Sequence, residues 1–293
     1  MILEVKKLKS EIFQNQKDLK DQYGLLNVSS LDKKNSKSIY WLKSLINYDN
    51  FSNCVLVVSD SDYDFLSEKN LLKQDIFHLR CLSDMKPRLT YSIFLNECLK
   101  KTKIYDDTKK HLKNKKIKIF GNVFIFNDVE IGDGTIIYPN VVIHNNVKIG
   151  KNCIIRENSS LGTTGMGFEK DSNGDWYHFP QVGGLVVGDN VEIGSHSDLK
   201  RGTINDTIVS RNCKLGSFTN IGHNCIIGEN SLFTNHCVVG GSAVIGKNFF
   251  MGICSSIKNG LTIGENVRVA ANVFVNENVN DNELTFGVNK KNL

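Results

Sequence analysis

An apolar residue recurs at every sixth position through most of the second half of this chain. The register is unbroken from Ile119 to Leu161 and, after two interruptions, again from Val209 to Val275. Glycine directly follows many of these apolar residues. An α-helix repeats every 3.6 residues and a half-buried strand every two, so neither produces a six-residue period. This period is the signature of a parallel β-helix.

Simple geometry gives each position of the repeat a role. One hexapeptide forms a short strand and a turn, and three hexapeptides complete a triangular coil. The apolar residue points inward and stacks on its equivalent in the next coil, about 4.8 Å away, as strands do in a sheet. The fourth residue after it also faces inward, at a corner where only small side chains fit. We therefore expect a mainly β fold with seven to eight coils.

Eight cysteines need an explanation in a chain whose first residues, MILEVKKLKSEIF, contain no apolar core of a signal peptide. The expected compartment is the reducing cytoplasm, where a disulfide framework is not expected. No CxxC pair or Cys/His cluster has the spacing of metal ligands, so we expect neither a metal nor any permanently bound cofactor. Half of the cysteines fall on the small inward position of the repeat and are expected to fill the core: Cys153, Cys213, Cys225 and Cys237. No role follows for the other four: Cys54, Cys81, Cys98 and Cys254.

The residues before the repeat have a different pattern, which indicates a small α/β domain over residues 1–105. A strand is expected at Cys54–Ser59, and a packed helix is expected after Pro87. A basic connector over 106–118 then leads into the β-helix at 119–280, which carries an insertion at 162–186. Residues 281–293 are expected to form a short tail. No apolar run is long enough to span a membrane.

Positive charge is concentrated before the repeat, where residues 1–118 carry 23 Lys and Arg against 15 Asp and Glu. Nine of the lysines lie between Lys100 and Lys118. This stretch is either a solvated helix face or a surface that attracts an acidic or phosphate-bearing partner. The sequence contains no nucleic-acid-binding motif, so we do not expect DNA or RNA as a partner.

Several segments resemble one enzyme family. The first interruption reads LGTTGMGFEKDSNGDWYHFPQVGG, and VVGDNVEIGSHSDLKRGTINDTIV and IGHNCIIGENS follow it. Together they resemble the UDP-3-O-(3-hydroxyacyl)glucosamine N-acyltransferases of lipid A biosynthesis, within the hexapeptide-repeat acyltransferases. GLLNVSSLDKKNSKSIYWL and MKPRLTYSIFLNECL resemble the opening and the end of that family's uridine-binding domain. The resemblance implies a left-handed β-helix, a homotrimer and active sites between subunits.

N-acyl transfer needs a base, because the attacking amine loses a proton, and a donor for the oxyanion that forms. His223 matches the family's catalytic histidine in the segment Ile221-Gly222-His223-Asn224. The resemblance therefore implies that His223 is the general base. Gly241 lies eighteen residues later, one coil away on the same face, and matches the glycine whose N–H binds the oxyanion. For each residue the alternative is a purely structural role. His223 would then be a solvent-facing histidine in a turn, and Gly241 would be the glycine of a tight turn.

Substrate contacts are implied for six further residues. Trp41 and Tyr48 align with or near the aromatic residues that bind uracil, although both are equally compatible with a domain core. Phe168, His178 and Gln181 lie in the insertion, and Asn224 follows the base.

Other polar residues of the repeat have weaker expectations. His144 and His196 are expected to point outward. His236 is thirteen residues beyond His223, so we expect it elsewhere on the coil with a surface role, unless trimer packing brings it to a neighbour's site. Asp206 or Asp198, in the preceding coil, is a candidate to orient the base.

These observations predict an N-acyltransferase that moves a 3-hydroxyacyl group from a pantetheine thioester to the amine of a UDP-linked amino sugar. The acceptor-loop motif favours an acyl carrier protein as donor. The ending ELTFGVNKKNL resembles that of sugar acetyltransferases and favours acyl-coenzyme A, so both donors stay open. Two alternatives remain: an acetyl- or acyl-coenzyme A-dependent enzyme acting on a nucleotide-linked deoxyamino sugar for O-antigen or capsule, and a non-catalytic nucleotide-sugar binder.

Overall fold

A computed structural model describes residues 2–4, 13, 25–28, 38–41, 45, 48, 51, 54–82, 85–99 and 116–286. The chain divides into two compact units. One unit contains residues 1–103 together with 166–180, and the other contains 104–165 and 181–293. Most of the expected connector at 106–118 lies outside the described residues.

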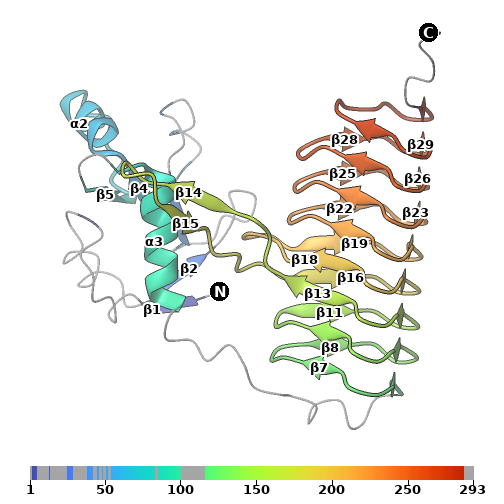
Figure 1. Cartoon of the computed structure of the whole chain (residues 1–293). Coiled ribbons are helices and arrows are strands. Elements are labelled where there is room, and N and C mark those ends of the chain that lie inside the picture. Colours follow the sequence, from blue (N-terminus) through green and yellow to red (C-terminus); the bar gives the residue numbers. More distant parts are fainter. Residues whose placement is uncertain are drawn as a thin grey trace. The chain divides into compact units, whose positions relative to one another are not determined.

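The N-terminal unit is built on a five-stranded sheet of order β1-β2-β3-β4-β5 (Figure 1). Its strands are β1 (Ile2–Glu4), β2 (Leu25–Val28), β3 (Ser38–Trp41), β4 (Cys54–Val58) and β5 (Ile76–Arg80). Only β1 and β2 pair antiparallel. The strand β4 has the sequence CVLVV and is buried throughout, as expected for the interior of a parallel sheet. The predicted α/β class and the strand at Cys54 are confirmed.

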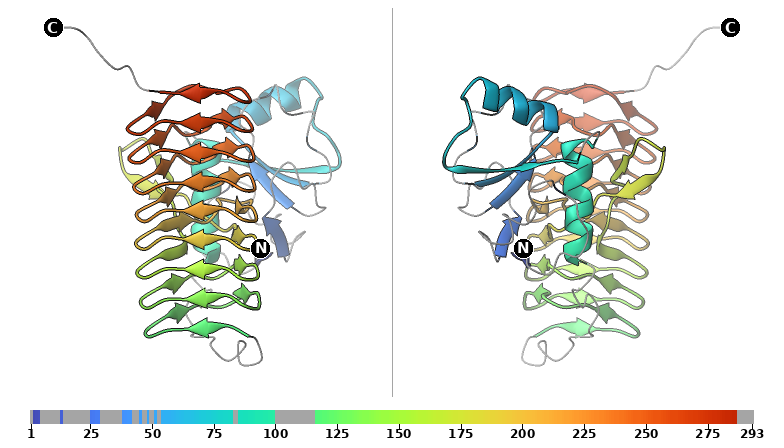
Figure 2. Two further views of the ribbon diagram at one scale, coloured as in Figure 1. Left: turned by 90° about the vertical axis from the view of Figure 1, so that its right-hand side faces the viewer. Right: turned by 90° about the vertical axis from the view of Figure 1, so that its left-hand side faces the viewer.

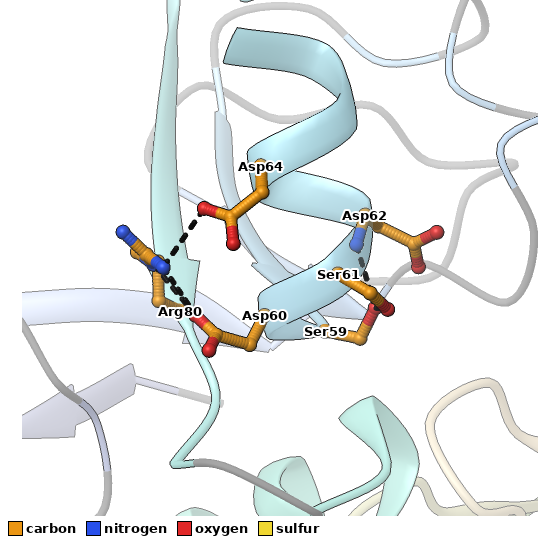
Figure 3. Close-up of polar contacts among 6 residues, drawn as sticks. All are labelled: Ser59, Asp60, Ser61, Asp62, Asp64 and Arg80. Atoms are coloured by element: carbon orange, nitrogen blue, oxygen red, sulfur yellow. Dashed lines mark hydrogen bonds and ion pairs between the residues drawn. The ribbon is translucent and has the colours of Figure 1, made fainter. Parts of the chain in front are cut away.

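Two helices accompany this sheet, and the sequence explains where each begins. In α2 (Asp60–Glu68), the hydroxyl of Ser59 accepts a hydrogen bond from the N–H of Asp62 at 3.1 Å and so caps the first turn (Figure 3). Arg80 of β5 pairs with Asp60 and Asp64 on the same helix (Figure 3). The second helix, α3 (Pro87–Leu99), begins at its proline, which is favoured in the first turn because its missing N–H has no acceptor there.

The other unit is a parallel β-helix whose coils stack one on the next (Figure 2). Its first face contains β7 (Phe124–Ile125), β10 (Val142–Ile143), β13 (Ser160–Thr163), β18 (Asp198–Lys200), β21 (Asn220–Ile221), β24 (Val238–Val239), β27 (Ser256–Ile257) and β30 (Phe274–Val275). The second contains β8 (Glu130–Ile131), β11 (Val147–Ile149), β16 (Leu185–Val187), β19 (Thr207–Val209), β22 (Ile226–Ile227), β25 (Val244–Ile245) and β28 (Thr262–Ile263). The third contains β6 (Lys118–Ile119), β9 (Ile136–Ile137), β12 (Ile154–Ile155), β17 (Glu192–Ile193), β20 (Lys214–Leu215), β23 (Leu232–Phe233), β26 (Phe250–Met251), β29 (Arg268–Val269) and β31 (Leu284–Thr285).

The expected stacking of apolar residues is confirmed. Ile125 pairs with Ile143, eighteen residues on, and the second residue of nearly every two-residue strand is buried. Faces of eight, seven and nine strands correspond to about eight coils. Ile119 is 38% exposed, because its strand pairs on one side only and lies at the end of the column.

The position four residues after the apolar one faces inward as expected, but it is not limited to small side chains, because Phe249 is fully buried there against Phe233. All four cysteines predicted to fill the core are fully buried. Each thiol also lies near a backbone carbonyl of a neighbouring coil, for example Cys225 Sγ at 3.1 Å from the oxygen of Gly240. Hydroxyls occupy the same place elsewhere, as in Ser159 Oγ, which donates to the oxygen of Gly194 at 2.9 Å. Burial raises the pKa of Cys213 and of Cys225 to about 11, so both thiols stay protonated and unreactive near neutral pH.

Two boundaries differ from the expected ones. The last strand, β31, continues the third face to Thr285, beyond the expected end of the β-helix at 280. Within the first interruption, β14 (Phe168–Lys170) and β15 (Trp176–His178) form an antiparallel hairpin. This hairpin belongs to the N-terminal unit, where it lies against α3 (Figure 1).

Candidate active site

His223 lies in the turn that joins β21 to β22, between the first and second faces of the β-helix. Its side chain is half-buried. Nδ1 of the imidazole is 2.8 Å from Oδ1 of Asn224. Nε2 has no hydrogen-bond partner among the residues that the structure describes. One ring nitrogen is therefore held by the protein and the other is available to a ligand.

Gly241 occupies the equivalent turn one coil further on. A Cβ atom at this position would lie 2.7 Å from Nε2 of His223, too close for any side chain. The residue with positive φ in this turn is Ser242, at 62°, so backbone conformation is not the reason for a glycine at 241. The N–H of Gly241 donates to no acceptor in the described part of the chain. Gly241 thus leaves room for the imidazole and presents an unused donor beside it.

The two ends of the first interruption meet next to this imidazole. The N–H of Gly165 donates to Oε1 of Gln181 at 2.6 Å, and the Gln181 side chain is buried. A Cβ at Gly165 would lie 2.8 Å from Cδ2 of His223. The structure therefore brings Gln181 to the site as a buried support of the loop stem. Gly165 was not predicted; it is the first glycine of the GMGF segment.

The second interruption, residues 200–206, contributes the remaining support. Thr203 donates two hydrogen bonds to Oδ1 of Asn224, from its N–H at 3.1 Å and from its hydroxyl at 2.7 Å. Its own carbonyl oxygen accepts from the N–H of Val182 at 2.8 Å. Thr203 therefore links the turn of the base to the stem of the first interruption. The break in register marked this segment, but no local pattern in the sequence predicts a role for Thr203.

Neither aspartate considered as a partner of the base fills that role. Oδ1 of Asp206 accepts from the N–H of Gly184 at 2.7 Å. Asp198 pairs with Thr163 and, at 2.6 Å, with the ammonium group of Lys200. The near partner of His223 is instead the neutral amide of Asn224, in the same turn, and the hydroxyl of Thr203 lies 3.5 Å from the same ring nitrogen, Nδ1.

His144 and Arg201 lie on the same side of the coils. Arg201 is buried, and its guanidinium donates to the backbone oxygen and to the side chain of Asn145. Burial, and next the positive charge of Arg201, lower the pKa of His144. His144 is therefore held neutral near physiological pH.

The other two residues expected in the insertion belong to the N-terminal unit. The rings of Phe168 and His178 meet edge to face across the hairpin, with their centroids 5.3 Å apart. The carbonyl oxygen of His178 accepts hydrogen bonds from Ser92 Oγ at 3.0 Å and from Asn96 Nδ2 at 2.9 Å, both on α3. Substrate contact by these two residues stays a prediction.

The two aromatic residues expected to bind uracil lie in separate clusters. Trp41 packs against Tyr91 and Phe179, with ring centroids 4.9 and 5.8 Å away. Tyr48 is buried, and its hydroxyl is 2.8 Å from Nε2 of His78. The structure does not bring Trp41 and Tyr48 together into one stacking site, and their role in binding remains untested.

His196 and His236 lie at another corner of the β-helix, between its third and first faces. Their rings stack on opposite sides of Phe218 at 4.9 and 4.7 Å, nearly parallel to it. All three residues are exposed, and each has a positive φ near 60°.

The described residues contain neither a cluster of candidate metal ligands nor a candidate membrane-spanning helix. No three His, Cys, Asp or Glu side chains in that part of the chain group as they would around a metal ion. None of its helices has the length and apolarity to cross a bilayer.

Comparison with known proteins agrees with this architecture. The family model described as bacterial transferase hexapeptide (six repeats) matches residues 128–163 and 206–241. The second segment contains His223, Asn224 and Gly241, and both segments leave out the hairpin. The chain therefore carries the hexapeptide repeat of bacterial transferases.

Two similar curated proteins share one name. Over 158 residues the chain is 34% identical to the UDP-3-O-acylglucosamine N-acyltransferase of Herminiimonas arsenicoxydans, covering 54% of this chain and 45% of that protein. The enzyme of the same name from Janthinobacterium sp. (strain Marseille) is 34% identical over 154 residues, covering 53% and 44%. A solved UDP-N-acetylglucosamine acyltransferase from Francisella novicida gives a TM-score of 0.48 at 24% identity, covering 55% of this chain and 59% of that one. The predicted resemblance is confirmed, over less than half the length of these curated relatives.

Proposed function

We propose that this protein is an N-acyltransferase that acylates the amine of a UDP-linked amino sugar, with a pantetheine thioester as donor and His223 as general base. The observation that carries the proposal is the half-buried imidazole whose Nε2 has no partner in the described chain, next to the unused N–H of Gly241. The relatives named UDP-3-O-acylglucosamine N-acyltransferase supply the class of acceptor.

The reaction follows from these two groups. The acceptor amine attacks the thioester carbonyl while Nε2 of His223 removes its proton, so a C–N bond forms and an imidazolium results. The carbonyl oxygen gains negative charge, which the N–H of Gly241 is available to stabilise. The tetrahedral intermediate then expels the thiolate, which takes the proton back from His223. The products are the amide and the free thiol.

Both interruptions of the repeat support this role. The first closes with Gly165 and Gln181 against the imidazole, and the second holds Asn224 through Thr203. Insertions at a corner of a rigid scaffold are suited to shaping a binding site. We further propose that the protein acts as a homotrimer in the cytoplasm and that Trp41, Tyr48, Phe168 and His178 contribute to binding the acceptor.

Thiol release tests the proposal directly. The purified chain is incubated with UDP-linked amino sugars and, separately, a 3-hydroxyacyl carrier protein, a long-chain acyl-coenzyme A or acetyl-coenzyme A. We expect amide product with one of these donors, and the donor that works settles between carrier protein and coenzyme A. Replacing His223 by Ala should lower kcat by about 10²- to 10⁴-fold, as expected for loss of a general base.

The matched control is His236→Asn. It alters an exposed histidine at another corner to the residue that most turns of this β-helix have at that position. It should keep full turnover. Full turnover by His223→Ala, or no amide with any donor, would overturn the proposal.

A further inference from the structure

The oxygen and nitrogen of the Asn224 side chain can be told apart by their surroundings. One terminal atom lies 3.1 Å from the backbone N–H of Thr203, which can only donate. That atom must accept, so it is the carbonyl oxygen Oδ1. The hydroxyl of Thr203 donates to the same oxygen at 2.7 Å. The orientation of the amide is therefore fixed from outside the turn that contains His223.

This orientation determines which ring nitrogen of His223 carries the proton. Nδ1 lies 2.8 Å from Oδ1 of Asn224, and an amide oxygen offers only lone pairs. The Thr203 hydroxyl also lies 3.5 Å from Nδ1, but its one proton goes to Oδ1 of Asn224 at 2.7 Å. A deprotonated Nδ1 would therefore face only lone pairs, whereas Nδ1–H makes a hydrogen bond. In a neutral imidazole the proton is on one nitrogen only, so Nε2 must be unprotonated.

We propose that Asn224 is a positioning residue that holds neutral His223 as its Nδ1–H tautomer, with Thr203 keeping the amide in place. A histidine side chain free in water prefers the opposite tautomer, with the proton on Nε2. The turn therefore selects the form whose Nε2 lone pair points away from Asn224, toward the space beside Gly241. The catalytic consequence rests on the proposed function, but the tautomer does not.

The backbone conformation of Asn224 allows its side chain to be removed without straining the turn. Its φ is 60°, a left-handed value that glycine adopts without strain. Asn224→Gly therefore removes the acceptor and leaves the turn intact. Asn224→Asp keeps an acceptor oxygen at the same place. Asn230→Gly is the matched control, because Asn230 has a φ of 61° in the next turn of the chain and does not contact His223.

The experiment is ¹⁵N NMR of protein labelled in its histidines, recorded at a pH where the imidazole is neutral. Signals of His223 are identified by their loss in His223→Gln. We expect the Nδ1–H tautomer in the unmodified protein, in Asn224→Asp and in Asn230→Gly. Asn224→Gly should change mainly to Nε2–H. The Nε2–H form in the unmodified protein, or unchanged Nδ1–H in Asn224→Gly, would overturn the proposal.

Turnover gives a second readout with the donor found above. In Asn224→Gly, kcat should fall by about 10²-fold or more, since a base in the wrong tautomer cannot accept the proton, while KM changes little. Asn224→Asp should restore most of the rate. Unchanged kcat in Asn224→Gly would overturn the catalytic part. If the unmodified protein shows no turnover but the NMR result holds, the proposed function fails and the tautomer assignment stands.

Discussion

At the scale of single residues, two positions of the repeat have properties that the six-residue period alone does not predict. One is the inner corner position, and the other is the residue before it. At the inner corner position, many side chains are Cys, Ser or Thr, and these reach carbonyl oxygens of the coils. Others at the same position are apolar and buried, such as Val141, Val191 and Phe249. The sequence predicted that only small side chains fit here, which the fully buried Phe249 contradicts, and the hydrogen bonds from Cys, Ser and Thr depend on backbone spacing that required the structure. The residue before it takes a left-handed φ near 60° and is usually Asn. Cys254 falls on this exposed position, which explains why it does not fill the core.

Gly241 allows a sharp test of the space around the base. Gly241→Ala keeps the N–H but places a methyl group 2.7 Å from Nε2 of His223, so the imidazole must leave its observed position. We expect kcat to fall by about 10²-fold, in the range for loss of a general base, while the melting temperature changes by only a few degrees. Steady-state kinetics and thermal melts of the two proteins measure this. Unchanged kcat in a folded Gly241→Ala would show that the imidazole does not work from its observed place.

At the scale of elements, the regular coils could be predicted from the sequence and the interruptions could not. The six-residue period predicted the strands, the inward residues and the number of coils, because every hexapeptide packs against the neighbouring coils in the same way. A break in the period shows only where the chain leaves the coil. What Thr203 and Gln181 contact depends on residues from other coils, and no local pattern contains that information.

Deleting residues 202–205 tests whether the second interruption is needed by the active site and not by the β-helix fold. The deletion brings Val209 to six residues after Leu199 and leaves Thr207 on the small inner position, so the hexapeptide register becomes continuous. We expect the β-helix to fold, with a circular-dichroism spectrum like that of the full chain, because the coil loses no inward residue. Turnover should be lost, because Thr203 no longer holds Asn224.

The outcome separates two explanations of the break in register. A deletion variant that fails to fold would mean that the segment is needed by the β-helix itself. A folded variant that keeps its turnover would show that Thr203 is dispensable. Thr203→Val, which removes the hydroxyl but keeps the N–H, provides the milder companion variant.

At the scale of the whole molecule, the hairpin inserted into the β-helix sequence belongs to the other unit. Ser92 and Asn96 of α3 donate to the carbonyl oxygen of His178, and Arg88 pairs with Glu169. Phe179 is fully buried against Trp41 and Tyr91. The sequence predicted a substrate loop here but not this packing, since the partners are more than eighty positions away along the chain.

This packing predicts how the hairpin loses its structure. In native-state hydrogen exchange with increasing urea, amides of residues 168–178 should lose protection together with β4 and β5, because they belong to one compact unit. Amides of β13 and β16, which flank the hairpin in sequence, should follow the β-helix instead. Mass spectrometry of peptic fragments resolves the two groups.

A double substitution makes the test specific. Ser92→Ala with Asn96→Ala removes both hydrogen bonds to His178, worth about 0.5–1.5 kcal/mol each, so hairpin exchange should speed up by about 5- to 150-fold. Ser67→Ala, at an exposed site on α2, should leave it unchanged. Hairpin amides that exchange with β13 and β16, and do not respond to the double substitution, would show that the hairpin is stabilised by the β-helix. The expected pattern would instead mean that the hairpin is stabilised by the N-terminal unit, although its stem at Gly165 and Gln181 lies next to His223.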